Sequence, residues 1–208
     1  MTNKEQTMNA HNAIAKQYYE LYKDDKSDLA YFDEFLSTCE KRVLDLGCGM
    51  GHYSKYMKSK GFDVVGVDFS KQMIKIAKKT CPKTKFHVAD ICDLKVLKKE
   101  KFDGVVLAYV IQHLSKAEVE HVIKNLDKNL NPSAKMLLFV REGDQVLTEE
   151  EPIDTSFQYI INEYTQKEIT ELLNKNGWNV TFAQKKPKVN DPYSLAPDTM
   201  VVIAERRL

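Results

Sequence analysis

An acid and three glycines stand close together in the stretch VLDLGCGMGHYS, residues 43–54. The acid is Asp45, and the glycines are Gly47, Gly49 and Gly51. Glycine is needed where the backbone turns through positive φ or approaches a ligand without a Cβ in the way. A helix is expected to begin near His52, and its first turn would present free N–H groups and the positive end of its dipole. The stretch therefore predicts a ligand-binding turn.

The spacing of the glycines separates two kinds of ligand. A dinucleotide-binding turn has the pattern G-x-G-x-x-G, which would place its third glycine at position 52, where this chain has His52. The pattern here is G-x-G-x-G, and the acid two residues before it would repel a pyrophosphate. The same acid suits a ligand with a cationic end. A nicotinamide dehydrogenase is therefore a distant alternative.

The elements that must position this turn alternate along the chain. Short β-branched runs are separated by longer stretches in which apolar residues have helical spacing. The strands are expected at 42–46, 63–67, 85–89, 103–108 and 135–140. This order predicts a doubly wound α/β fold, with a parallel sheet and helices on both faces. The runs VVGV and GVVLA are apolar on both faces, as a strand covered on two sides requires.

The segments before the first strand and after the fifth strand have other sequence patterns. Helices are expected before the first strand at 7–23 and 29–38, and after the fifth strand at 166–176, where Gly177 would close the last one. Residues 142–163 have no clear period, and a structureless segment of that length is typical of a lid or binding loop. Runs at 178–183 and 200–205 are expected to pair antiparallel at one edge.

Composition excludes several classes of protein. The chain has 208 residues, which suits one domain over 1–208, and a net charge of +1, which gives no bulk attraction to nucleic acid or membrane. The longest apolar run, 105–111, is too short for a bilayer, which needs about 20 residues. No signal peptide is visible, and four scattered cysteines form no disulfide framework or zinc-ligand pattern. We expect a cytoplasmic protein without a metal site.

Four stretches together resemble the class I S-adenosylmethionine-dependent methyltransferases, in particular a bacterial small-molecule branch of the type 11/12 kind. Beside the glycine turn, they are GFDVVGVDFS at 61–70, FHVADICDL at 86–94 and FDGVVLAYVIQHL at 102–114. The resemblance implies a Rossmann-like, seven-stranded, mostly parallel sheet. It also implies an N-terminal helical lid at 1–40 and an acceptor-side loop at 142–164, with S-adenosylmethionine as cofactor.

The resemblance also implies which residues hold the ribose and adenine. Asp68, at the end of the second strand, would accept hydrogen bonds from the ribose hydroxyls, and Asp90 would accept one from the adenine amino group. The backbone N–H of Ile91 would meet a ring nitrogen, while Phe69 and Met73 would pack on the adenine face. Alternatives remain: Asp68 could be a helix N-cap, and Phe69 and Met73 could be plain helix-core residues.

The methionine end of S-adenosylmethionine would be held by the glycine turn and two further residues. By the resemblance, the turn contributes Asp45, Gly47, Cys48 and Gly49. The backbone carbonyl of Ala108 would take the methionine ammonium, and Tyr18 would close over this end of the cofactor. As an alternative, Tyr18 is a core tyrosine on an amphipathic helix.

Methyl transfer to an acceptor is an in-line displacement, so the protein mainly aligns the groups and excludes water. A general base is needed only if the acceptor loses a proton early. His113 has an ordinary pKa near neutrality and is the candidate base or orienting group; alternatively it is a hydrogen-bonded turn residue. Further acceptor-side candidates are Tyr109, Gln112, Arg141, Glu142, Tyr159 and Tyr164.

Charge distribution bears on the acceptor. Residues 71–101 contain ten lysines and three acids, whereas 142–171 contain nine acids and one lysine. The acidic segment favours a neutral or cationic small-molecule acceptor. The lysine-rich segment keeps an RNA methyltransferase as an alternative, although no aromatic residues are interleaved for stacking. A non-catalytic S-adenosyl-ligand binding protein is the other alternative. After the fourth strand this chain has LAYVIQ, where enzymes that methylate amino groups of adenine or glutamine have N-P-P-Y, and this difference argues against such an activity. We expect a monomer or homodimer.

Overall fold

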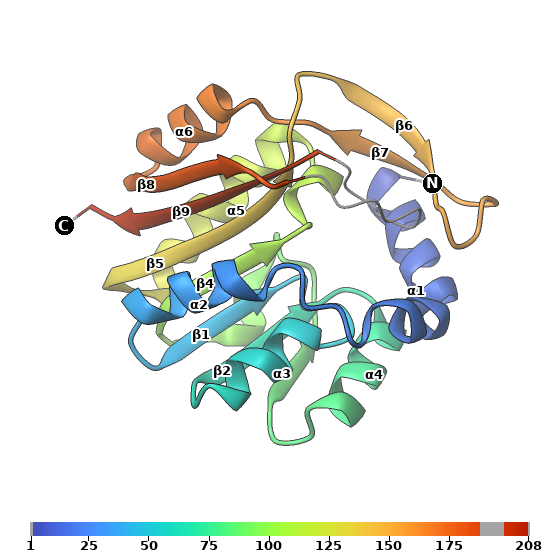
Figure 1. The fold of residues 1–208 in the computed structure, drawn as a ribbon, viewed down its shortest axis with the longest axis horizontal. Coiled ribbons are helices and arrows are strands. Elements are labelled where there is room, and N and C mark those ends of the chain that lie inside the picture. Colours follow the sequence, from blue (N-terminus) through green and yellow to red (C-terminus); the bar gives the residue numbers. More distant parts are fainter. Residues whose placement is uncertain (1, 188–197, 208) are drawn as a thin grey trace.

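A seven-stranded sheet forms the centre of the computed structural model, which describes residues 2–187 and 198–207. Its strand order is β3-β2-β1-β4-β5-β9-β8 (Figure 1). The strands β3, β2, β1, β4 and β5 are mutually parallel, and β9 runs antiparallel to both β5 and β8. The bounds are β1 Arg42–Leu46, β2 Asp63–Asp68, β3 Lys85–Val88, β4 Phe102–Ala108, β5 Leu130–Arg141, β8 Trp178–Lys185 and β9 Thr199–Arg206. The predicted fold class is confirmed.

Helices cover both faces of this sheet. Their bounds are α1 Asn3–Tyr22, α2 Leu29–Thr38, α3 His52–Ser59, α4 Lys71–Thr80, α5 Lys116–Leu126 and α6 Gln166–Lys175, with short 3-10 turns at Leu94–Leu97, Ile111–His113 and Asp127–Asn129. Successive residues of β5 alternate between two apolar cores, because strand side chains point to opposite faces. Leu138 packs with α5 and α6, and Leu137 packs with α2 and α3.

Local sequence signals explain where most helices begin. Thr2 and Glu5 form a reciprocal capping box, so α1 begins at Asn3 and is four residues longer at this end than the apolar spacing predicts. Ser70 caps α4 by accepting a hydrogen bond from the backbone N–H of Met73 at 3.1 Å. The helix predicted at 29–38 is confirmed with the same bounds.

The last two strands pair antiparallel at one edge of the main sheet, as predicted. Residue Phe182 of β8 pairs with Ile203 of β9, and Leu138 of β5 pairs with Val202. The strand β9 therefore lies between β5 and β8. It is buried along most of its length, whereas β8 forms the outer edge of the sheet.

The segment 142–164 is not the structureless loop that the sequence predicts. It forms a separate two-stranded antiparallel sheet from β6, Val146–Glu150, and β7, Gln158–Asn162. The reason for the difference is visible in β7, where Tyr159 and Ile161 point inward against Ala10 of α1. The alternation of buried and exposed residues in β7 spans only five residues and is followed by polar ones, so the sequence alone gives a weak signal for a strand.

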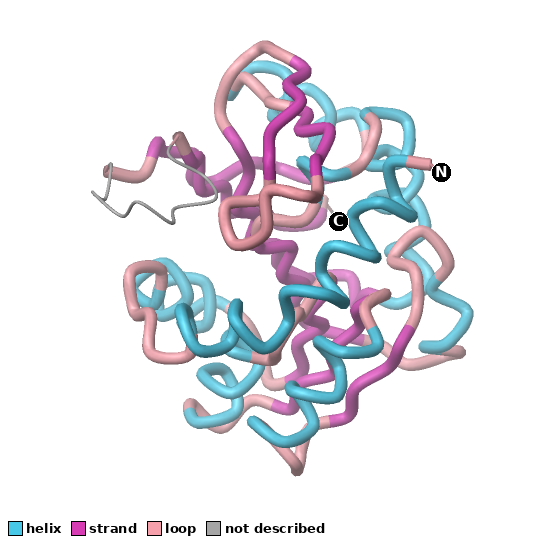
Figure 2. The backbone as a smooth tube through the Cα atoms, turned by 90° about the vertical axis from the view of Figure 1, so that its right-hand side faces the viewer, coloured by secondary structure: helices cyan, strands magenta, loops and turns pink. Residues whose placement is uncertain are grey.

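Three elements enclose the end of the sheet at which the parallel strands terminate. The helix α1 crosses this end, and β6 and β7 lie above it (Figures 1 and 2). The helix contacts both α4 and β7. Among the described residues, no helix is both long and apolar enough to cross a bilayer.

Candidate active site

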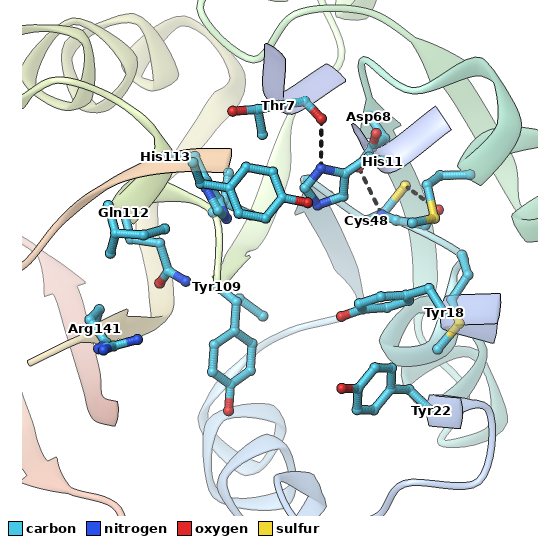
Figure 3. A pocket seen from close by; sticks show the side chains of 18 of the residues that line it. Thr7, His11, Tyr18, Tyr22, Cys48, Asp68, Tyr109, Gln112, His113 and Arg141 are labelled. Carbon is cyan, nitrogen blue, oxygen red and sulfur yellow. Dashed lines mark hydrogen bonds between the residues drawn. The ribbon is translucent and has the colours of Figure 1, made fainter. Parts of the chain in front are cut away.

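A cavity of about 430 Å³ lies between the carboxyl ends of the parallel strands, α1 and the β6–β7 sheet. Its wall contains eleven of the twelve residues that the sequence assigns to cofactor binding and catalysis. They are Tyr18, Gly47, Cys48, Gly49, Asp68, Phe69, Met73, Asp90, Ile91, Ala108 and His113. Figure 3 shows part of this wall. Residues that are far apart in the sequence thus meet around one space.

The glycine turn after β1 has the conformation that its glycines permit. Gly47 has φ of +72°, and a Cβ built there would lie 2.2 Å from Cγ2 of Val110, so no larger residue fits. Gly49 has φ of +48°, and a Cβ there would meet no atom within 4 Å. Gly47 is therefore required for packing, while Gly49 leaves room for a ligand to approach the backbone.

Asp68 is buried at the end of β2 and holds the glycine turn. Its two carboxylate oxygens accept hydrogen bonds from the backbone N–H groups of Gly49 at 2.9 Å and Ser70 at 2.8 Å. Burial raises the pKa of Asp68, against the opposing effect of these hydrogen bonds and of nearby His11. Ser70 supplies the side-chain cap of α4, so Asp68 is not that cap, and its carboxylate lines the cavity.

Asp90 follows β3 at another part of the cavity wall. It accepts hydrogen bonds from the Lys4 ammonium and from the backbone N–H of Cys92, both at 2.9 Å. Partial burial opposes ionisation of Asp90, but these hydrogen bonds outweigh it and lower the pKa. Asp93, three residues after Asp90, does not line the cavity and instead accepts a hydrogen bond from the N–H of Lys95.

Asp45 does not line the cavity, unlike the other predicted site residues. Its side chain is 1% exposed, and it accepts a 2.6 Å hydrogen bond from the Ser54 hydroxyl of α3. Burial raises the pKa of Asp45 to about 7, and the neighbouring charge of Asp68 acts in the same direction against the hydrogen bond from Ser54. In this arrangement Asp45 supports the glycine turn from behind.

Aromatic side chains from α1 form part of the cavity wall. The rings of Tyr18 and Tyr22 lie 4.6 Å apart, and both line the cavity (Figure 3). Tyr18 is half-buried and also packs against the apolar cluster of Ala15, Met50 and Met73, so it belongs both to the packing of α1, as the alternative states, and to the cavity wall. Met73 and Phe69 also line the cavity; Met73 packs in addition against Ala15 of α1.

The acceptor-side candidates divide into two groups. Tyr109, Gln112, Arg141 and Tyr159 line the cavity together with His113. Glu142 lies outside it and pairs with Lys185 at 2.6 Å, and Tyr164 is buried in the core. Arg141 pairs with Glu149 at 2.8 Å and Glu163 at 3.4 Å, and not with its neighbour Glu142.

His113 is held close to two other rings. Its imidazole lies 5.3 Å from the ring of Tyr159 and 5.8 Å from that of His11, measured between centroids. Burial lowers the pKa of His113 to about 3, and the nearby His11 adds to this effect. His113 is therefore neutral near pH 7 and a weak proton acceptor in this arrangement.

Sequence reasoning missed a buried polar network around Asp28. The carboxylate of Asp28 accepts hydrogen bonds from the hydroxyls of Tyr53 at 2.6 Å and Tyr109 at 2.9 Å, and it pairs with Lys186. Asp28 stands at the N-cap position of α2 but makes no side-chain cap. Tyr109 adopts a left-handed φ of +61°, which is unusual outside glycine. No sequence signal links these residues, since the tyrosines and Lys186 are 25 to 158 positions away.

His11 on α1 was also missed. Its Nδ1 lies 2.8 Å from the backbone carbonyl oxygen of Thr7, which can only accept, so Nδ1 carries the proton (Figure 3). The ring lies among Phe69, His113 and Tyr159 on the cavity wall. A histidine four residues after Thr7 on a helix gives no signal of this position.

Comparison with known families identifies a methyltransferase domain over residues 43–133. An uncharacterized methyltransferase of Alkaliphilus oremlandii is 34% identical over 96 residues, which are 46% of this chain and 44% of that protein. A ubiquinone biosynthesis O-methyltransferase of Coxiella burnetii is 29% identical over 111 residues, 52% of this chain and 47% of that protein. The chain thus spans less than half the length of these relatives.

Solved structures resemble the whole chain in fold. A 1,6-didemethyltoxoflavin N1-methyltransferase of Burkholderia thailandensis has a TM-score of 0.76 at 17% identity, covering 99% of this chain and 89% of that one. A magnesium protoporphyrin IX methyltransferase of Synechocystis has a TM-score of 0.74 at 16% identity, covering 99% and 98%. At these identities the likeness concerns the fold alone.

Proposed function

We propose that this chain, which belongs to the class I S-adenosylmethionine-dependent methyltransferase family, is an enzyme that moves a methyl group from S-adenosylmethionine to a small-molecule acceptor. One observation carries the proposal: the glycine turn, Asp68, Asp90 and Ala108 line a single cavity. They come from the ends of four neighbouring parallel strands, where ligands of such sheets bind.

The residues present fit the cofactor. Asp68 would hold the ribose hydroxyls, and Asp90 with the N–H of Ile91 would hold the adenine edge. The open space beside Gly49 supports close approach of the methionine part to the backbone. Tyr18 of α1 would cover that end. Asp45 is better placed to fix the turn through Ser54 than to touch the cofactor itself.

The cofactor supplies a methyl group that is already activated by the positive charge on sulfur. The protein has to align the acceptor and keep water out, for which no metal is required. The helix α1 and the β6–β7 sheet are suited to exclude water because both close over the cavity. We assign His113 to orienting the acceptor, because its lowered pKa makes it a weak base.

The acceptor end of the cavity is acidic. Glu149, Glu150 and Glu151 line it, and the cation Arg141 is already paired with Glu149. This balance supports a neutral or cationic acceptor over a phosphate-rich one. The toxoflavin-precursor and magnesium-protoporphyrin methyltransferases among the fold neighbours give general support to a small molecule.

Transfer of a labelled methyl group into an extract of the source cells tests the proposal. The extract is separated by size and treated with nuclease before counting. We expect label in the small-molecule fraction. Nuclease-sensitive label in the large fraction would replace this proposal by an RNA methyltransferase, with the lysine-rich segment 71–101 as the face to mutate. Cofactor binding without any label would indicate a non-catalytic binding protein.

A further inference from the structure

Gln112 is a buried amide on the acceptor side of the cavity whose carbonyl oxygen has no partner among the described residues. It lies in the 3-10 turn after β4, its side chain is 2% exposed, and its Oε1 accepts no hydrogen bond from residues 2–187 or 198–207. Figure 3 shows the amide directed into the cavity between Arg141 and Tyr109. A buried carbonyl without a donor loses its hydration and gains nothing in exchange. A ligand that donates a hydrogen bond would compensate this loss.

His113, the next residue, carries a second atom of this kind. Its Nδ1 is buried and has no hydrogen-bond partner in the described part of the chain. Both side chains line the same cavity. Two buried, unsatisfied polar atoms on side chains of one cavity wall are unusual, and the polar edge of a bound ligand would account for them.

The cationic side chains around this place already have partners. Arg141 pairs with Glu149, and Lys186 pairs with Asp28. An anionic ligand group would have to break one of these ion pairs, whereas an N–H or O–H group would donate to Gln112 directly. The polar edge is therefore a hydrogen-bond donor without negative charge.

The remaining wall is aromatic. The ring of Tyr159 lies 5.3 Å from that of His113 and 5.7 Å from that of His11, and the ring of Tyr109 also faces the cavity. Aromatic side chains around a buried space favour an aromatic ligand, because contacts between rings add stabilisation beyond the burial of apolar area. This property, together with the single free carbonyl, restricts the class of acceptor.

We propose that the acceptor is a planar aromatic or heteroaromatic molecule with an N–H or O–H donor group, and that Gln112 recognises this group through its carbonyl oxygen. The inference rests on the proposed function, because it assigns the acceptor end of the same cavity. Gln112 is in this view a specificity-determining residue.

Matched probe pairs test the inference on the full chain saturated with S-adenosylhomocysteine. The pairs are indole with 1-methylindole and 2-naphthol with 2-methoxynaphthalene; cyclohexanol is the non-planar probe. Affinities are measured by ligand-detected NMR titration. We expect the donor-bearing member of each pair to bind about 2- to 12-fold more tightly, as a neutral hydrogen bond allows, and cyclohexanol to bind more weakly than either.

The variant Gln112→Met keeps the side-chain volume but removes the carbonyl. We expect it to abolish the preference within each pair while leaving S-adenosylhomocysteine affinity unchanged and the thermal midpoint unchanged or higher. Gln184→Met, at an exposed position of β8, is the matched control and should retain the preference.

Equal affinities within both pairs, a preference that survives in Gln112→Met, or no binding of any planar probe would each overturn the acceptor assignment. Failure of the wild-type chain to bind S-adenosylhomocysteine would instead overturn the proposed function. The two failures are separated because cofactor-product affinity is measured first and without any probe.

Discussion

Asp45 and Asp68 are buried carboxylates on adjacent strands, and their neighbours give them different properties. Asp68 accepts two backbone hydrogen bonds and lines the cavity, whereas Asp45 accepts one from Ser54 and is sealed behind the glycine turn. A carboxylate that touches solvent or ligand can contribute to binding. One that is enclosed contributes mainly to the stability of the turn.

At Asp68 we predict a loss of cofactor affinity. Asp68→Ala should weaken S-adenosylmethionine binding by about 1.5–3 kcal/mol, the usual contribution of hydrogen bonds to a charged group. Isothermal titration calorimetry measures the change. Asp93→Ala, an acid of the same region outside the cavity, is the control and should bind as the parent does. An Asp68→Ala protein with parental affinity would show that the ribose is held elsewhere.

At Asp45 we predict a pH-dependent stability. Its pKa in the folded protein is about 7, above the ordinary 3.8, so the folded chain holds a proton that the unfolded chain has lost. The resulting stabilisation is present below about pH 4 and is lost as the pH rises through 7. Between these values the free energy of unfolding should fall by up to about 1.4 kcal/mol per pH unit from this group.

Urea denaturation from pH 5 to 8 measures this effect. In Asp45→Asn the amide cannot titrate, so the difference in stability between variant and wild type should shift in favour of the variant as the pH rises. Asp144→Asn, at an exposed position, serves as the control. A pH-independent difference for Asp45→Asn would contradict the prediction.

At the scale of elements, α1 is fastened to both ends of the cavity. Lys4 binds Asp90 on the cofactor side, and Asn3 donates to the carbonyl of His113 on the acceptor side. Asn3 also accepts a hydrogen bond from the N–H of Ile160 in β7. The first turn of α1 thus contacts both the expected cofactor region and the expected acceptor region, as a lid over both would.

Hydrogen exchange should separate these covering elements from the sheet. The β6–β7 ladder has only two strands and a small apolar cluster, so its amides are expected to exchange faster than those of β5 and β9. Addition of S-adenosylhomocysteine should slow exchange in α1, because the ligand would hold the helix closed. Mass spectrometry of peptides from each element reports both effects. Equal protection of β6 and β9 without ligand would contradict the expected faster exchange of the β6–β7 ladder.

At the scale of the molecule, two apolar cores leave one end of the sheet for ligands. The cores lie on opposite faces of the sheet and include strand residues as far apart as Leu44 and Val202. The cavity lies beyond them, at the ends of the strands. A ligand there contacts several elements at once, and its binding energy adds to the stability of the folded chain.

Thermal unfolding tests this coupling and the choice of cofactor. S-adenosylhomocysteine at 100 times its dissociation constant should stabilise the fold by about 2.7 kcal/mol, which raises Tm by about 5–11 °C for a domain of this size. The oxidised nicotinamide dinucleotide at the same concentration should leave Tm unchanged, because the glycine spacing does not fit its pyrophosphate. A larger shift with the dinucleotide would revive the dehydrogenase alternative.

The sequence by itself determined the fold class and most of the cofactor wall. Alternating runs predicted β1 to β5, and the strand ends carry Asp68 and Asp90, so parallel pairing brings both acids to one side of the sheet. Such local signals suffice for the elements because hydrophobic period and glycine spacing depend on residues close together in the chain, whereas the cofactor roles were implied by the resemblance to a family. The same signals missed the length of α1 and the pairing of β6 with β7.

Only the tertiary structure decided which side chains reach the cavity. Asp45 belongs to the motif yet lies behind it, and Asp28 has the position of a helix cap yet binds Tyr53, Tyr109 and Lys186. The partner of Arg141 and the free carbonyl of Gln112 are likewise invisible in the sequence. Such contacts join positions up to 158 residues apart, and no local pattern encodes which distant side chain completes a buried polar group.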